Sequence, residues 1–122
     1  MILVDTSVWV DHLRQGVPEL AALLDGQEVL VHPYVVGELV LGGLGRQREV
    51  VALLQELPAP VVAESAEVLA LVEHEALWGR GIGYVDAALL ASARLTTGAR
   101  LWSRDRRLAA AADALGVGER LG

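Results

Sequence analysis

Residues 2–9 read ILVDTSVW, and this stretch predicts how the fold begins. The apolar run at residues 2–4 has no polar face, which indicates a buried strand that ends at Asp5. The VWVDHL that follows has helical spacing, and Gly16 ends the predicted helix. A buried strand that passes directly into a helix is typical of α/β domains.

The same alternation continues along the chain. Further strands are predicted at residues 28–32, 61–63 and 99–103, and further helices at 18–25, 33–45, 48–57, 66–78, 84–96 and 104–116. Residues 116–122 supply a short edge strand at most. Because the strands lack a polar face and alternate with helices, we expect a single α/β domain over residues 1–122, with a central, mostly parallel sheet flanked by helices.

Composition excludes several classes of protein. A chain of 122 residues fits one domain by the usual range of roughly 100 to 200 residues, and 53% hydrophobic residues argue against disorder. The absence of Cys and Lys removes thiolate and Schiff-base chemistry and the phosphate-binding P-loop. No apolar run reaches the roughly 18 residues of a membrane span, and no basic leader precedes Ile2, so we expect a soluble, cytoplasmic protein.

Four acidic residues stand at or beside the ends of separate predicted elements. Asp5 follows the first strand, Asp105 follows the strand at 99–103, and Asp86 lies in the first turn of the helix at 84–96. Glu38 lies in the middle of its helix, and we expect neither Asp86 nor Glu38 on a solvated face. In parallel sheets, ligands collect at the carboxyl ends of the strands, so the four side chains are expected around one cleft.

Helix capping is the competing explanation for three of these acids. Asp5 and Asp105 precede helices as N-caps do, and Asp86 suits the positive end of a helix dipole. Carboxylates held close together repel one another, however, and in a chain without Lys only protons, Arg or a cation can neutralise them. Oxygen ligands alone favour hard ions such as Mg²⁺ or Mn²⁺.

Four blocks of sequence carry a resemblance to a known family. They are DTSVW at residues 5–9, GEL at 37–39, GIGYVDAALLASA at 81–93 and LWSRD at 101–105. In their order and spacing the chain resembles a PIN-domain ribonuclease of the VapC toxin type over nearly its whole length. The resemblance implies that Asp5, Glu38, Asp86 and Asp105 are the catalytic, metal-binding acids, and that Thr6, Ser7 and Ser103 are the polar residues that support them. The family commonly has Thr where this chain has Ser103.

The same resemblance implies an activity and partners. We expect an endoribonuclease toxin that hydrolyses RNA with Mg²⁺ or Mn²⁺ and is inhibited by a cognate antitoxin protein. Asp5 and Asp86 are the expected direct ligands, while Glu38 and Asp105 bind directly or through water. The apolar helices between residues 33 and 57 are expected to bury a partner, as a homodimer and with the antitoxin.

Two residues are candidates for contact with RNA phosphates, and two other functions remain open. Arg80 lies in the loop before Asp86, and Arg104 lies beside Asp105 together with Arg106 and Arg107. Solvated charges or salt bridges are nevertheless the more common explanation of such residues. The competing functions are a catalytically inactive PIN-like binding or regulatory module, with structural acids, and a small-molecule phosphohydrolase of the DxD type. The chain lacks the DxD motif of such a phosphohydrolase, because Thr6 and Ser7 follow Asp5 and no second Asp lies two residues after it.

Overall fold

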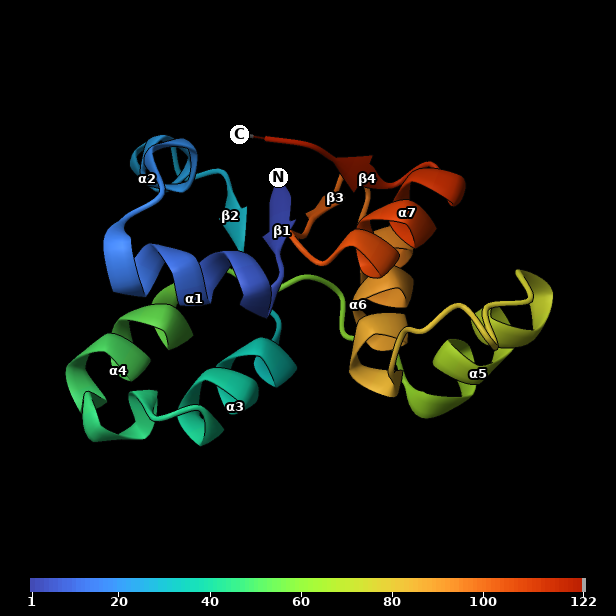
Figure 1. The fold of residues 1–122 in the computed structure, drawn as a ribbon, viewed down its shortest axis with the longest axis horizontal. Helices are drawn as coiled ribbons and strands as arrows, with labels where there is room; N and C mark the ends of the chain where they lie inside the picture. Colours follow the sequence, from blue (N-terminus) through green and yellow to red (C-terminus); the bar gives the residue numbers. More distant parts are fainter. Residues whose placement is uncertain (122) are drawn as a thin grey trace.

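The computed structural model describes residues 1–121, and its elements follow the predicted alternation (Figure 1). The strands are β1 (Ile2–Val4), β2 (Val29–Leu30), β3 (Arg100–Trp102) and β4 (Gly118–Glu119). The helices are α1 (Thr6–Gln15), α2 (Pro18–Asp25), α3 (Pro33–Leu41), the short 3₁₀ helix η1 (Leu44–Arg46), α4 (Arg48–Glu56), α5 (Ser65–His74), α6 (Tyr84–Leu95) and α7 (Arg106–Ala114). Gly122, the last residue of the predicted domain, lies outside the described residues.

The four strands form one parallel sheet in the order β2-β1-β3-β4, which confirms the predicted α/β fold with a parallel sheet. In the β1–β3 pair, Val4 lies opposite Trp102. The chain passes from β1 to β2 on one side and from β3 to β4 on the other, so the topological switch point lies between β1 and β3. In sheets of this kind, ligands bind beyond the carboxyl ends of the strands at such a point.

Burial of their side chains explains why such short strands suffice to form the sheet. Leu3, Val4, Leu101 and Trp102 are almost fully buried, as a strand covered on both faces requires. The helix α6 is buried without interruption over residues 87–93, and α5 packs against it through Val68 and small alanine side chains. The N-terminus of α6 is therefore held firmly by the packing of its own helix.

The prediction of a strand at residues 61–63 is wrong, because the structure has no strand there. The backbone N–H of Val61 donates to Thr96 Oγ1 at 2.8 Å, and the N–H of Ala63 donates to Ser92 Oγ at 3.2 Å. Both acceptors are side chains near the end of α6, so these N–H groups are not available to a sheet neighbour. The segment is an extended connection across α6 between α4 and α5.

The helix predicted at residues 66–78 is shorter in the structure, because α5 ends at His74. Ala76 has a positive φ of 50°, and the N–H of Leu77 donates to the carbonyl of Val72 at 3.0 Å. This turn directs Leu77 into the core, where it is 2% exposed. Burial of one leucine thus outweighs continuation of the helical pattern.

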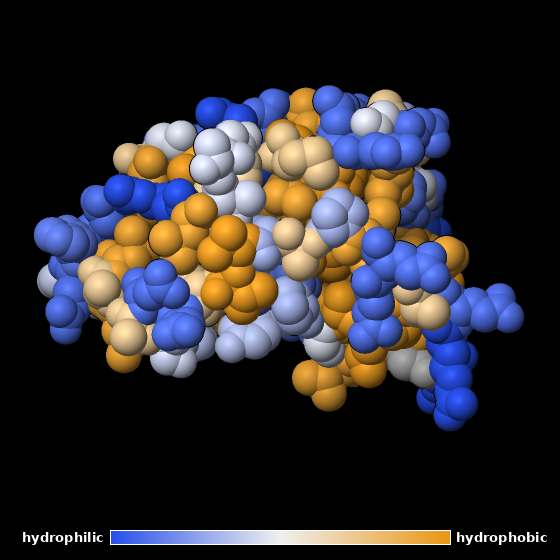
Figure 2. All heavy atoms as spheres, turned by 180° about the vertical axis from the view of Figure 1, so that it is seen from behind, coloured by the Kyte–Doolittle hydropathy of each residue, from blue (hydrophilic) through white to orange (hydrophobic). Residues whose placement is uncertain are grey.

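Hydrophobic side chains also reach the surface. Leu41 at the end of α3 is 89% exposed and Leu53 in α4 is 62% exposed. Figure 2, the view from behind, shows hydrophobic residues on the surface between hydrophilic ones. Within residues 1–121, no helix is both long and apolar enough to cross a membrane. Exposed leucines on neighbouring helices are typical of surfaces that bind another protein.

His32 connects β2 to α3 and is completely buried. Its Nδ1 accepts a hydrogen bond from the N–H of Tyr34 at 2.9 Å, which makes His32 the N-cap of α3. Its Nε2 has no hydrogen-bond partner among the described residues. Burial lowers the pKa of the imidazole, because the charged form would lose its hydration.

We expect this histidine to make the protein less stable in acid. Below about pH 6.5 the unfolded chain binds a proton at His32 that the folded chain binds only at lower pH, so the free energy of unfolding falls as the pH falls. His32→Asn keeps a capping oxygen but does not titrate, so its stability should fall less between neutral and mildly acidic pH. Urea unfolding over this pH range measures the difference. His74→Asn, at an exposed position, should retain the wild-type slope, and an unchanged slope in His32→Asn would contradict the prediction.

Candidate active site at the carboxyl edge of the sheet

Asp5 lies at the carboxyl end of β1 and is 5% exposed. Because Val4 and Trp102 are opposite each other, the next residues along the two strands, Asp5 and Ser103, are also neighbours. Ser103 Oγ donates to Asp5 Oδ2 at 2.8 Å, across 98 positions of sequence. Ser7 Oγ donates to the same oxygen at 2.7 Å, and the Ser7 N–H lies 3.4 Å from it. The pairing of two strands therefore positions a nearly buried carboxylate.

The two serine hydroxyls also tie the helices to the sheet. Ser7 Oγ accepts from the N–H of Arg104 at 3.0 Å, and Ser103 Oγ accepts from the N–H of Asp105 at 3.0 Å. The two hydroxyl oxygens lie 3.3 Å apart. The beginning of α1 and the connection from β3 to α7 are thus joined by one hydrogen-bond network around Asp5.

Asp86 lies in the first turn of α6 and is half-buried. Its Oδ2 accepts from the N–H of Gly83 at 3.1 Å. The pKa of its carboxyl is raised, first by burial and then by the negative charges of Asp5, Asp105 and Glu38, against the opposing effect of the Gly83 hydrogen bond. The four acids are therefore close enough for the charges of the other three to act on Asp86.

Glu38 differs from the expectation, because its side chain is exposed to solvent. The buried face of α3 carries Val35 and Leu39, and Glu38 lies at the margin of that face. Its partner is also not an arginine. Thr6 Oγ1 donates to Glu38 Oε1 at 2.7 Å and so links α1 to α3.

Three of the acids cap helices, as the competing explanation predicts. Asp5 caps α1, Asp105 Oδ1 accepts from the N–H groups of Arg107 and Leu108 at the start of α7, and Asp86 forms the cap hydrogen bond with Gly83 in α6. In each of the four acids, including Glu38 with its bond from Thr6, the hydrogen bonds within the described residues reach only one carboxylate oxygen. Within residues 1–121, no hydrogen bond reaches Asp5 Oδ1, Glu38 Oε2, Asp86 Oδ1 or Asp105 Oδ2. Capping and ligation of a cation are therefore compatible.

The donor set fits a hydrated divalent cation better than a closed cage. All four candidates offer carboxylate oxygen, which hard cations such as Mg²⁺ prefer. Among the described residues, no three acidic or histidine side chains are gathered closely enough to hold one ion by themselves. Mg²⁺ commonly binds through one or two carboxylates and keeps several waters, so it does not require such a cage.

The arginines predicted to contact phosphates are partly engaged within the protein. Arg104 Nη1 pairs with Asp11 Oδ2 at 2.8 Å, and Arg80 Nη2 lies 3.3 Å from the carbonyl oxygen of Glu75. Asp11 was not a sequence candidate, although its position four residues after Ser7 on α1 places both on one helix face. Its carboxylate holds the Arg104 side chain against α1.

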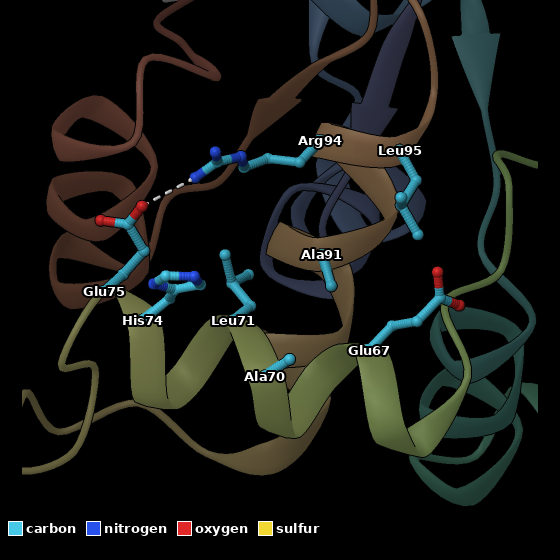
Figure 3. Close-up of a pocket in the computed structure, with 8 residues that line it drawn as sticks. All are labelled: Glu67, Ala70, Leu71, His74, Glu75, Ala91, Arg94 and Leu95. Carbon is cyan, nitrogen blue, oxygen red and sulfur yellow. Dashed lines mark hydrogen bonds and ion pairs between the residues drawn. The ribbon is translucent and has the colours of Figure 1, made fainter.

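An apolar groove between α5 and α6 lies apart from the acids. Figure 3 shows Ala70, Leu71 and Ala91 between the two helices, with the Arg94–Glu75 ion pair at one end. The ion pair is 3.0 Å long. None of the four acids lines this groove, so we place the candidate site at the carboxyl edge of the sheet.

Comparisons with known proteins concern the family of the chain as a whole. The family model described as PIN domain matches residues 2–114. The chain is also 50% identical over 117 residues to proteins named Ribonuclease VapC32 from two strains of Mycobacterium tuberculosis, CDC 1551 / Oshkosh and ATCC 25618 / H37Rv. Each match covers 96% of this chain and 94% of the relative.

We expect Ser103→Ala to destabilise the protein, because it leaves the Asp5 carboxylate with one hydrogen bond fewer in a nearly buried position. A lost hydrogen bond to a charged group costs about 1–3 kcal/mol. Urea unfolding at neutral pH measures the loss. Ser103→Thr keeps the hydroxyl and should remain close to the wild type, while equal losses in both variants would show that the hydroxyl is not what stabilises this position.

Proposed function

Because this chain belongs to the PIN-domain family, we propose that it is a metal-dependent endoribonuclease toxin of the VapC type, which hydrolyses phosphodiester bonds of RNA. The observation that carries the proposal is the arrangement of four acids. Asp5 and Asp105 follow the adjacent strands β1 and β3, and Thr6, next to Asp5, donates a hydrogen bond to Glu38. The charges of these three acids add to the effect of burial in raising the pKa of Asp86. The relatives named Ribonuclease VapC32 support this reaction class over almost the full length of the chain.

The proposed cofactor is Mg²⁺ or Mn²⁺. A bound divalent ion lowers the pKa of a water ligand and stabilises negative charge on a phosphoryl group. Asp5 and Asp86 would hold the cation, and Glu38 and Asp105 would bind it directly or through water. Ser7 and Ser103 keep Asp5 in one orientation, and Thr6 does the same for Glu38.

The reaction is the in-line attack of a water molecule on the phosphorus. A bond forms between the water oxygen and phosphorus as the water gives up a proton, the bond from phosphorus to the leaving sugar oxygen breaks, and that oxygen takes up a proton. Glu38 is exposed, so its carboxylate is accessible to a water molecule and orients it for the attack. Asp86 lies within reach of the charges of the other three acids, and the Gly83 N–H holds its carboxylate at the start of α6.

We expect Mn²⁺ or Mg²⁺ to raise the melting temperature of the wild type, because the cation binds the folded site and removes the repulsion between carboxylates. At ten times the dissociation constant, the stabilisation is about 1.4 kcal/mol, or several degrees. Asp86→Asn should shrink the rise, although without metal it should melt at or above the wild-type temperature, since it removes a charge whose ionisation is unfavourable.

Asp25→Asn serves as the matched control, because Asp25 is an exposed acid at the end of α2. It should respond to the cation as the wild type does. Cleavage of a labelled RNA pool in Mn²⁺ and in EDTA, with the same three proteins, then tests the reaction itself. A wild type that neither gains stability from the cation nor cuts RNA would favour an inactive PIN-like binding module with structural acids.

We also propose two protein partners, a cognate antitoxin and a second copy of the chain. Leu41 and Leu53 expose apolar surface on α3 and α4. A groove lined by Val10, Leu13 and Leu39 lies beside them and includes Glu38. An antitoxin in this groove would contact an acid of the proposed site, which accounts for inhibition.

We expect light scattering at micromolar concentration to give the mass of a dimer. Leu53→Glu should shift the mass towards the monomer, because it places a charge on the proposed apolar interface. Leu69→Glu, which changes a 55% exposed leucine of α5, should not. A monomeric wild type, or dissociation by Leu69→Glu alone, would contradict dimerisation through α3 and α4.

A further inference from the structure

Three arginines line an open cavity next to the acids. Arg80 from the connection between α5 and α6, together with Arg106 and Arg107 from α7, surrounds a cavity of about 580 Å³. Alanines of α7 form the rest of its lining. In a chain with a net charge of -6, three positive side chains around one cavity form a local site for an anion.

The positions of Arg106 and Arg107 are unfavourable for the helix itself. They occupy the first turn of α7, where the helix dipole is positive and acidic side chains are preferred. Among the described residues, none of the three arginines forms an ion pair with a carboxylate. A bound anion would supply the negative partner that these three side chains lack.

The cavity and the acids are built from the same two segments. Asp105 directly precedes Arg106, and its carboxylate accepts from the N–H of Arg107. The loop that carries Arg80 continues to Gly83, whose N–H is bonded to Asp86. The segments that supply the arginines of the cavity are therefore the same ones that hold Asp105 and Asp86 in place.

Gly81 sets the position of Arg107. It has a positive φ of 76°, and a Cβ at this position would lie 2.6 Å from Arg107 Cδ and 2.7 Å from Nη1. The Arg107 side chain therefore lies directly against the glycine backbone. A larger residue at 81 would displace the guanidinium from the cavity.

We propose that Arg80, Arg106 and Arg107 bind a backbone phosphate of the RNA next to the scissile one, with Gly81 holding Arg107 in place. The inference rests on the proposed ribonuclease function and assigns these residues to substrate positioning. Phosphate contacts carry no sequence information, so the subsite binds RNA of any sequence. It retains the strand while the acids act on the neighbouring phosphate.

Binding without cleavage tests the subsite separately from the reaction. Fluorescence anisotropy of a labelled single-stranded RNA of mixed sequence is measured in EDTA over a range of salt concentrations. Arg106→Gln and Arg107→Gln should each weaken binding about ten-fold, and each should lower the slope of log affinity against log salt by about 0.7. Arg48→Gln removes an arginine from the same first-turn position in α4, and it should retain wild-type affinity.

Two glycine variants test the geometry rather than the charge. Gly81→Ala should weaken RNA binding, because the new Cβ displaces Arg107. Gly79→Ala imposes the same backbone strain, at a φ of 74°, but its Cβ would meet no atom within 4 Å. It should bind RNA like the wild type, and melting curves of both variants verify that they are folded.

The outcomes separate this subsite from the proposed function. If the arginine variants bind RNA like the wild type, or if Arg48→Gln loses as much affinity as Arg107→Gln, the subsite is overturned while RNA cleavage by the wild type still supports the nuclease. If the wild type neither binds nor cleaves RNA, both proposals fail. Loss of affinity in Gly81→Ala but not in Gly79→Ala supports the assigned role of Arg107.

Discussion

The register between β1 and β3 is the constraint on which the candidate site depends. Val4 lies opposite Trp102, so the first residues beyond the two strands are neighbours, and Asp5 receives a hydroxyl hydrogen bond from Ser103. A shift of one residue would turn the side chains of a strand to the other face and would remove this contact. The buried side chains of both strands hold the register, because Leu3 and Leu101 would lose their places in the core.

The same carboxylates stabilise the fold and are available for chemistry. Hydrogen bonds to one oxygen start a helix or orient the side chain, and the other oxygen is left for a ligand. The acids are thus positioned before a cation binds, which is the preorganisation that a catalytic site requires. The hydrogen bonds do not remove the repulsion between the acids, which adds to the larger effect of burial in raising the pKa of Asp86.

Local patterns in the sequence predicted most of the architecture. Apolar runs without a polar face identified β1, β2 and β3, and the parallel sheet followed from their alternation with helices. The resemblance to PIN-domain ribonucleases supplied the roles of the acids, which remain proposals here. Capping was also foreseen from residue type, for Asp5 and Asp105.

Long-range contacts account for what the sequence did not predict. The side chains of Ser92 and Thr96 occupy the N–H groups of residues 61 and 63, which no local pattern reveals. The exposure of Glu38 depends on how α3 packs, and the pairing of Arg104 with Asp11 joins residues 93 positions apart. In the same way, the contact of Arg107 with Gly81 depends on two segments that meet only in the folded chain.

The connection between Asp5 and Ser103 has a consequence for the synthesis of the protein. Asp5 is made before Ser103 and Asp105, and 98 positions of sequence separate it from Ser103. An incomplete chain that lacks β3 has no strand to hold Asp5 from that side, and it lacks one of the four acids. For a protein proposed to cut RNA, this order means that a ribosome carries no assembled cleavage site until β3 and the start of α7 have been made.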